Sequence, residues 1–286
     1  MTEKELKASN PWKEVANMFN PEEKDCLFRD ENKEWYVYSE DKERIAEFNQ
    51  NCKEGDTDLI ITNTPPEPWR GNPLTANLII LTLNPGYDSN INKTLASLIQ
   101  SVDNVREELV NFRKRTLQLE AVSMMPEIDN TGKPISCKEA EDMLSGWYWT
   151  KNLKALREQS GLDENEFWKR IAVIEFHGYS STTCNKRFPL CGKDSGILKS
   201  QSFNKDLIEY IVNNRGSEVR FLIVRAKKQW VDFLGGIYDK SLFLSKENKG
   251  RSTSITKKNL AAKDKDGQIE KDVFEEIKKA VRRNLK

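Results

Sequence analysis

One apolar run constrains the fold of this chain more strongly than any other feature. Residues 78–83 read Leu-Ile-Ile-Leu-Thr-Leu and carry no charge, a pattern typical of a strand that is buried on both faces of a parallel α/β sheet. The run ends at Asn84, because Pro85 removes a backbone donor and fixes φ, while Gly86 permits a positive φ. Ligands of open α/β sheets bind beyond the carboxyl ends of strands, so Asn84 is a candidate site residue. The same residue types also form ordinary strand-to-helix turns, and that alternative stays open.

Strand and helix patterns alternate along much of the remaining chain. Further apolar runs predict strands at 171–176, 219–224 and 241–244, and periodic apolar positions predict helices at about 91–119, 138–159, 203–212 and 226–234. Strands that alternate with helices pair in parallel through right-handed crossovers. The sequence therefore predicts an α/β fold, a three-layer α/β/α sandwich around a central four-stranded, mainly parallel sheet.

The same pattern divides the chain into an extension and a larger domain. Residues 1–64 are acidic and carry no recognisable chemistry, which predicts an N-terminal extension packed on the core. Residues 65–286 then form the α/β domain, with a helical insert at about 120–165. The segment 64–73 holds four prolines and is expected to be irregular. It could be a plain linker, or it could place Trp69 and Arg70 beside the site.

Composition favours a soluble chain without a metal centre. No stretch of 18 apolar residues is present, and the first residues lack the apolar core of a signal peptide, so we expect a cytoplasmic protein with no membrane partner. The five cysteines never form a Cys-x-x-Cys pair, which argues against a zinc site or a disulfide framework and predicts reduced thiols. No cofactor is expected, and a monomer is the expected state. The cysteines are Cys26, Cys52, Cys137, Cys184 and Cys191.

Charge is unevenly distributed, although the net charge is only +1. Residues 1–60 carry 9 basic and 16 acidic side chains, whereas residues 241–286 carry 13 basic and 7 acidic ones. The C-terminal part is therefore the candidate for contact with phosphate groups. Solvated faces of helices would produce the same asymmetry, so this alternative also stays open.

The only histidine, His177, follows the predicted strand 171–176. Parallel strands end at one edge of a sheet, so His177 is expected at the same edge as Asn84. A single histidine is more often a hydrogen-bonded structural residue than a catalytic one. Its predicted position nevertheless makes His177 a candidate site residue.

The stretch Thr82-Leu83-Asn84-Pro85-Gly86 resembles the first active-site motif of the uracil-DNA glycosylase superfamily. The mismatch-specific and single-strand-selective branches carry Gly-x-Asn-Pro-Gly there, and Thr82 replaces the first glycine. The order of elements over residues 65–260 is similar to that family, which implies a uracil-DNA glycosylase-like fold. The second family motif, His-Pro-Ser-Pro or Asn-Pro-Ser-Gly, is not kept, and Asn248 and Ser252 are the nearest residues by position.

The resemblance implies a DNA glycosylase that extrudes a base from DNA and hydrolyses its N-glycosidic bond. Asn84 would position the attacking water, and His177 or Asn248 would donate a hydrogen bond to the departing base. The implied base-binding residues are Pro85, Gly86, Tyr87, Glu175, Tyr179 and Trp69. The implied DNA-binding residues, in a stretch rich in lysine and arginine, are Lys246, Lys249, Arg251 and Ser252.

Gly86 also bears on the choice of base. In the uracil-specific branch of this family, a tyrosine after the motif proline closes the pocket against substituents on carbon 5 of a pyrimidine, and Gly86 has no side chain to do so. The resemblance thus implies a 5-substituted pyrimidine, for example hydroxymethylated or glucosylated cytosine of phage DNA, and an antiviral role. The alternatives are a uracil-DNA glycosylase of base-excision repair, a non-catalytic DNA- or nucleotide-binding module, and another α/β enzyme. A nucleotide hydrolase would need a Gly-x-x-x-x-Gly-Lys loop or an acidic metal cluster, and the sequence has neither at its predicted strand ends.

Overall fold

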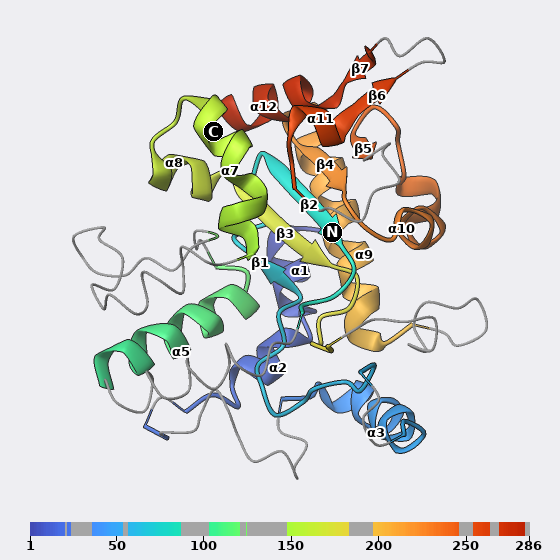
Figure 1. The fold of residues 1–286 in the computed structure, drawn as a ribbon. Helices are drawn as coiled ribbons and strands as arrows, with labels where there is room; N and C mark the ends of the chain where they lie inside the picture. Colours follow the sequence, from blue (N-terminus) through green and yellow to red (C-terminus); the bar gives the residue numbers. More distant parts are fainter. Residues whose placement is uncertain are drawn as a thin grey trace. The chain divides into compact units, whose positions relative to one another are not determined.

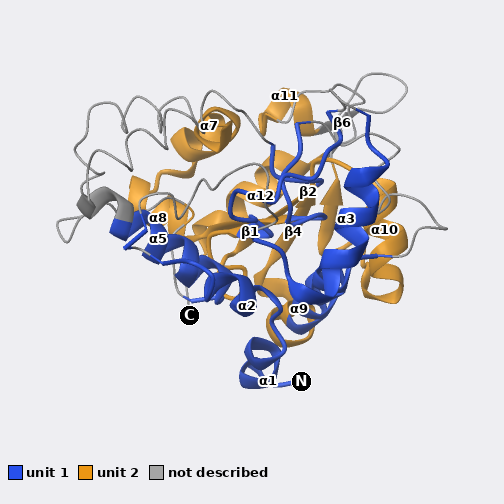
Figure 2. Ribbon diagram, turned by 90° about the horizontal axis from the view of Figure 1, so that it is seen from below, with its two compact units in different colours: residues 1–69, 83–121, 175–210 blue, residues 70–82, 122–174, 211–286 orange. Residues whose placement is uncertain are grey.

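We describe a computed structural model of the chain, shown in Figure 1. The structure describes residues 1–20, 22–23, 36–53, 57–86, 103–120, 124, 148–182, 197–245, 254–263 and 269–283. The chain forms two compact units, each assembled from three separate stretches (Figure 2). Unit 1 comprises residues 1–69, 83–121 and 175–210, and unit 2 comprises residues 70–82, 122–174 and 211–286.

The main sheet has five strands in the order β1-β3-β2-β4-β5. Two of its strand pairs are parallel, with Leu78 of β2 opposite Arg220 of β4, and Phe221 of β4 opposite Phe243 of β5. The fold is therefore a mixed α/β fold with a mostly parallel sheet, as the sequence predicts. The strands are β1 (Trp69–Arg70), β2 (Leu78–Thr82), β3 (Ile171–Glu175), β4 (Arg220–Ile223) and β5 (Phe243–Ser245).

The prediction of four strands is wrong by one. The additional strand, β1, is two residues long and lies inside the proline-rich segment that was expected to be irregular. The backbone beside it is paired, because Glu67 N donates to Gly178 O at 2.7 Å and Glu175 N donates to Pro68 O at 2.9 Å. A strand this short, bounded by Pro68 and Gly71, has too few residues to show an alternating pattern.

Two of the predicted helices lie in unit 2. Helix α10 (Lys227–Leu234) confirms the prediction for 226–234, and α7 (Tyr148–Ser160) covers the described part of the prediction for 138–159. The other elements of this unit were not predicted individually. They are α8 (Glu164–Lys169), η2 (Gly216–Glu218), η3 (Gly235–Ile237), α11 (Lys257–Leu260), the antiparallel pair β6 (Ala261–Lys263) and β7 (Ile269–Asp272), and α12 (Val273–Arg282).

Unit 1 contains the described helices that precede β1, the helix α5 that follows β2, and most of α9. The prediction for 91–119 is confirmed in its described part by α5, and the prediction for 203–212 by α9, which is longer at both ends and whose last turns belong to unit 2. The helices are α1 (Glu3–Ala8), α2 (Trp12–Ala16), η1 (Ser39–Asp41), α3 (Lys42–Gln50), α5 (Asp103–Leu117) and α9 (Lys199–Arg215).

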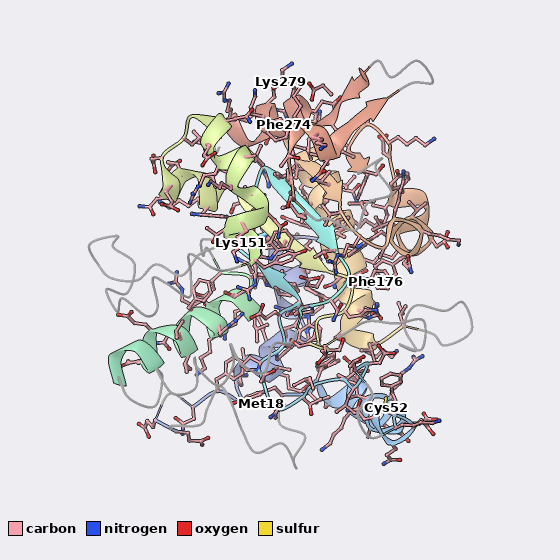
Figure 3. The ribbon with its side chains drawn as sticks, in the orientation of Figure 1. Met18, Cys52, Lys151, Phe176, Phe274 and Lys279 are labelled. Atoms are coloured by element: carbon pink, nitrogen blue, oxygen red, sulfur yellow. The ribbon has the colours of Figure 1, made fainter. Side chains whose placement is uncertain are left out.

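The core of unit 2 forms where one face of the sheet meets α7, α8 and α12. Every residue of β2 and β3 is buried, so side chains of both faces of these strands are covered. On one face, Leu78 and Ile80 belong to the same apolar cluster as Phe274 of α12, which is 0% exposed. Helix α12 is amphipathic, since Phe274 is buried whereas Lys279 on the same helix is exposed (Figure 3).

Candidate functional site

In unit 1, the segments that leave β2 and β3 continue to pair beyond the sheet. His177 N donates to Leu83 O at 2.9 Å, and Ser181 N donates to Pro85 O at 3.4 Å. Gly86 and Ser181 form an isolated parallel bridge. Two segments that are far apart in the sequence therefore lie side by side, and this pairing places Asn84 next to Ser181.

Asn84 is fixed by two hydrogen bonds of its side-chain amide. Nδ2 donates to Ser181 Oγ at 2.9 Å and to Pro85 O at 3.1 Å, and the side chain is half-buried. Within the described part of the chain, no donor reaches Asn84 Oδ1. The residue thus presents a carbonyl oxygen, which can accept a hydrogen bond from water or from a ligand.

The turn after Asn84 leaves room for another molecule. Pro85 is buried, whereas Gly86 is exposed. A Cβ atom built on Gly86 would meet no atom of the described residues within 4 Å. The backbone at Gly86 is consequently open to close approach, which glycine at a site often provides.

His177, at the exit of β3, is buried. Its side chain is 0% exposed, and its ring packs edge-on against Phe176, with the ring centroids 5.0 Å apart (Phe176 is labelled in Figure 3). Glu175 is 7% exposed, and its backbone carbonyl accepts a hydrogen bond from Asn204 Nδ2 at 2.8 Å. The structure places both residues in the interior of unit 1 and at the exit of β3, not on the open surface of the turn.

Tyr179 belongs to a buried polar cluster around Asp41. Its hydroxyl donates to Asp41 Oδ2 at 3.0 Å and accepts from Tyr38 N at 3.1 Å. The other oxygen of Asp41 accepts from the backbone N–H groups of Lys199 and Ser200 at 2.8 and 3.3 Å, so this carboxylate caps α9. Tyr179 thereby connects the exit of β3 to the N-terminal segment and to α9.

Burial dominates the acid–base properties of this cluster. Burial raises the pKa of Asp41 above its ordinary value, although the hydrogen bonds from Ser200, Tyr179 and Lys199 oppose the shift. Burial and the negative charge of Asp41 raise the pKa of Tyr179 well above its ordinary value, so the phenol remains protonated at neutral pH. These shifts fit an anchoring role, since neither group is presented to solvent.

Trp69 is also a core residue. It is 0% exposed, its Nε1 donates to Thr116 O at 2.6 Å, and its ring packs against Trp12 and Phe203. Gly178 lies under the same aromatic cluster, because an added Cβ would come within 2.5 Å of the ring of Trp12. This aromatic packing lies against the exit of β3 at Gly178.

Six of the predicted site residues lie outside the described residues: Tyr87, Lys246, Asn248, Lys249, Arg251 and Ser252. The residues that flank segment 246–253 are described, and both ends are anchored in unit 2. On one side, Lys227 Nζ donates to Ser245 Oγ at 2.8 Å. On the other, Ile255 N donates to Asn152 O at 2.8 Å, and Ser254 Oγ donates to Asn152 Oδ1 at 3.0 Å.

Asp41, Ser181 and Asn204 were not predicted as site residues. Asp41 lies 138 and 158 residues from its partners Tyr179 and Lys199, so no local pattern marks it. Ser181 could have been proposed from the sequence, because it follows the predicted strand 171–176 closely, as His177 does. Its contact with Asn84 depends on the register of the two exits, which the sequence alone does not fix.

A pocket of about 170 Å³ opens elsewhere in unit 1, lined by Tyr38, Glu40, Lys199 and Asp206 among others. The hydrogen bond to Glu40 raises the pKa of Tyr38 to about 12. None of the predicted site residues that the structure describes lines this pocket. Polar and charged groups of both signs surround it, and this lining does not define a ligand class.

Comparison of the chain with protein-family models, with characterised proteins and with solved structures finds no match. Among the described residues, no three histidine, cysteine, aspartate or glutamate side chains gather in a metal-binding arrangement. None of the described helices has both the length and the apolar character needed to cross a membrane. These comparisons add no residue to the candidate site, which consists of Asn84, Ser181 and the exposed turn at Gly86.

Proposed function

We propose that this chain is a DNA glycosylase built on a three-layer α/β/α sandwich of the uracil-DNA glycosylase kind. The observation that carries the proposal is Asn84, fixed just beyond the carboxyl end of a central strand with Oδ1 available to accept a hydrogen bond. An amide cannot act as a general base, but it can orient a water molecule. This is the role that the Asn-Pro-Gly resemblance assigns to Asn84.

The proposed reaction is hydrolysis of an N-glycosidic bond. Water supplies the oxygen that bonds to the anomeric carbon of the deoxyribose, and the glycosidic bond breaks with its electron pair going to the base. The proton that water releases then restores the neutral base. Positive charge develops on the sugar and negative charge on the base, so prealigned dipoles supply most of the rate.

Backbone N–H groups after Pro85 and one side-chain donor would meet the charge on the base. His177 and Asn248 are the two proposed donors. His177 is 0% exposed in this structure, so Asn248 is the better candidate for direct contact. Lys246, Lys249, Arg251 and Ser252 would bind DNA phosphates, as the basic character of this stretch favours.

The proposed substrate is a pyrimidine enlarged at carbon 5, such as hydroxymethylated or glucosylated cytosine of phage DNA. The space at Gly86 supports this choice, because no side chain of the described residues lies within 4 Å of a Cβ built there. The chain would then act as a cytoplasmic monomer in antiviral defence. Release of uracil in base-excision repair is the alternative for the same site.

The deciding experiment uses duplex and single-stranded oligonucleotides that contain uracil, 5-hydroxymethylcytosine or glucosylated 5-hydroxymethylcytosine. Abasic sites are detected by alkaline strand cleavage. We expect cleavage at a 5-substituted cytosine, no cleavage with Asn84→Ala, and loss of the enlarged substrate with Gly86→Tyr. Release of uracil alone would refute the substrate proposal, and the absence of abasic sites on every DNA would refute the glycosylase proposal.

A non-catalytic DNA-binding module is the second candidate. The burial of His177 and Tyr179 favours it, because two of the side chains expected near the base are core residues here. Such a module would bind DNA that contains a modified base or an abasic site without releasing any base. Fluorescence anisotropy with the same oligonucleotides distinguishes this behaviour from catalysis.

A further inference from the structure

The orientation of the Asn84 amide is determined by chemistry as well as by geometry. The amide can be turned so that either its nitrogen or its oxygen faces Pro85 O. A backbone carbonyl only accepts hydrogen bonds, so the atom 3.1 Å from Pro85 O must be the nitrogen. Oδ1 then points away from both Pro85 O and Ser181.

The bond to Pro85 O decides which amide atom faces the turn, but it joins neighbouring residues and does not tie the side chain to any other segment. The bond from Nδ2 to Ser181 Oγ joins residues 97 positions apart, and its length is 2.9 Å. It ties the Asn84 side chain to the exit of β3. The position of the Ser181 hydroxyl therefore determines where Asn84 Oδ1 lies.

Ser181 is itself held firmly. It is 0% exposed, its N–H donates to Pro85 O, and its backbone pairs with Gly86. The backbone carbonyl of the preceding residue, Ser180, accepts a hydrogen bond from Ile61 N at 2.9 Å. The exit of β3 thus lies between two chain segments, and this arrangement limits movement of the hydroxyl.

We propose that Ser181 is a positioning residue for Asn84: its hydroxyl accepts from Nδ2 and so holds Oδ1 in the orientation that accepts a hydrogen bond from the attacking water. This inference rests on the proposed function for its catalytic consequence, whereas its structural part stands on the two hydrogen bonds alone. Ser181 itself does not react. A displacement of a catalytic group by about 1 Å can reduce a rate by up to about 100-fold.

The test uses three variants of the full chain. Ser181→Ala removes the acceptor, and Ser181→Cys keeps nearly the same volume but offers a much weaker acceptor. Ser180→Ala is the matched control, since it removes a neighbouring hydroxyl and retains the backbone bond to Ile61. Circular dichroism establishes that each variant folds, and Ser181→Cys decides the question if Ser181→Ala does not fold.

The catalytic readout is steady-state kinetics on the oligonucleotide from which the wild-type chain releases a base. We expect both Ser181 variants to lower kcat by between about 10-fold and 100-fold with KM within about twofold of wild type, and Ser180→Ala to change neither. A merely structural role would instead lower the folded fraction and leave kcat per folded molecule unchanged. An unchanged kcat in both Ser181 variants would overturn the proposal.

A second readout is independent of catalysis. The side-chain NH₂ signals of Asn84 are assigned by nuclear magnetic resonance as those that disappear in Asn84→Asp, and their exchange with solvent is measured. We expect exchange at least about 10-fold faster in both Ser181 variants and wild-type exchange in Ser180→Ala. If no DNA yields an abasic site, the proposed function fails, and this measurement alone supports the positioning contact or, with unchanged exchange, overturns it.

Discussion

The interiors of the two units bury different charged groups. In unit 2, the sheet face and α12 meet through apolar side chains such as Ile80, Val173 and Phe274, each 0% exposed. In unit 1, the interior includes ionisable and amide groups, with Asp41, Gln201 and Asn204 all no more than 2% exposed. Unit 2 also contains buried hydrogen bonds, such as the one from the Arg170 guanidinium to Val281 O at 3.2 Å, but among the described residues the buried carboxylates all lie in unit 1.

This difference bears on the candidate site, which lies in unit 1. Buried polar groups cost free energy unless they are hydrogen-bonded, and a fully bonded network specifies one arrangement. Asp41 connects η1, the start of α9 and the exit of β3 through Tyr179. The candidate site residues Asn84 and Ser181 belong to the same unit. The buried carboxylate cluster and the candidate site therefore lie in one unit, and both Tyr179 and Ser181 belong to the exit of β3.

The largest expected effect comes from the apolar interior. Phe274→Ala should lower the free energy of unfolding by about 4 kcal/mol, because it removes a large buried side chain and leaves a cavity. Urea unfolding monitored by tryptophan fluorescence measures the loss. Lys279→Ala on the same helix is the matched control, and its exposed side chain should matter by less than about 0.5 kcal/mol. Equal losses for the two variants would contradict the assignment of Phe274 to the core.

The second effect tests the polar interior. Asp41→Ala should lower the free energy of unfolding by about 3 kcal/mol, because it leaves the Tyr179 hydroxyl and two N–H groups of α9 without their acceptors. Glu43→Ala, an exposed carboxylate on α3, is the control and should be nearly neutral. The same urea titration measures both. A loss below about 1 kcal/mol would show that water replaces Asp41 and that the cluster is not a determinant of unit 1.

The sequence predicts the apolar interior far better than the polar one. β2 and β3 are continuous apolar runs, and α10 has a helical pattern, so their positions follow from periodicity. β1 was missed because two residues show no period. Asp41 resembles any acidic residue of a solvated segment, and its burial depends on partners more than 100 residues away. The turn at Asn84-Pro85-Gly86 predicts Asn84 as a candidate from the sequence alone, whereas its contact with Ser181 depends on the register of two strand exits.

A smaller effect separates the contribution of the Tyr179 hydroxyl to stability from the contribution of its ring. Tyr179→Phe keeps the packing against Trp12, whose ring centroid is 5.3 Å away, and removes the bonds to Asp41 and Tyr38 N. We expect a loss of about 1.5 kcal/mol in the free energy of unfolding. Tyr148→Phe, at a residue that is 42% exposed, is the control. Because the phenyl ring of the variant would still cover Trp12, a loss as large as that of Asp41→Ala would contradict the central role given to the carboxylate.

The smallest effect is a dependence of stability on pH that has opposite signs in the two units. Burial raises the pKa of Asp41 in unit 1, whereas hydrogen bonds from Ser241 lower the pKa of Asp239 in unit 2. A carboxylate with a raised pKa binds more protons in the folded state than in the unfolded state between its two pKa values. Its contribution to stability is therefore fully present below the unfolded pKa and is lost as the pH rises through the folded pKa. For Asp239 the contribution is present above the unfolded pKa and is lost as the pH falls through the folded pKa.

Two single variants isolate these contributions. From about pH 7 toward about pH 4, the wild-type chain should gain stability relative to Asp41→Asn, because protonation removes the cost of a buried charge that asparagine never carries. Over the same range and further toward about pH 3, the wild-type chain should lose stability relative to Asp239→Asn, and the change should be small because Asp239 is exposed to solvent. Urea unfolding at several pH values measures both differences.

If the difference between wild type and Asp41→Asn did not vary with pH, Asp41 would titrate as in the unfolded chain, and its carboxylate would have to be solvated. The contrast that assigns the buried carboxylates of the described residues to unit 1 would then fail at its most specific point.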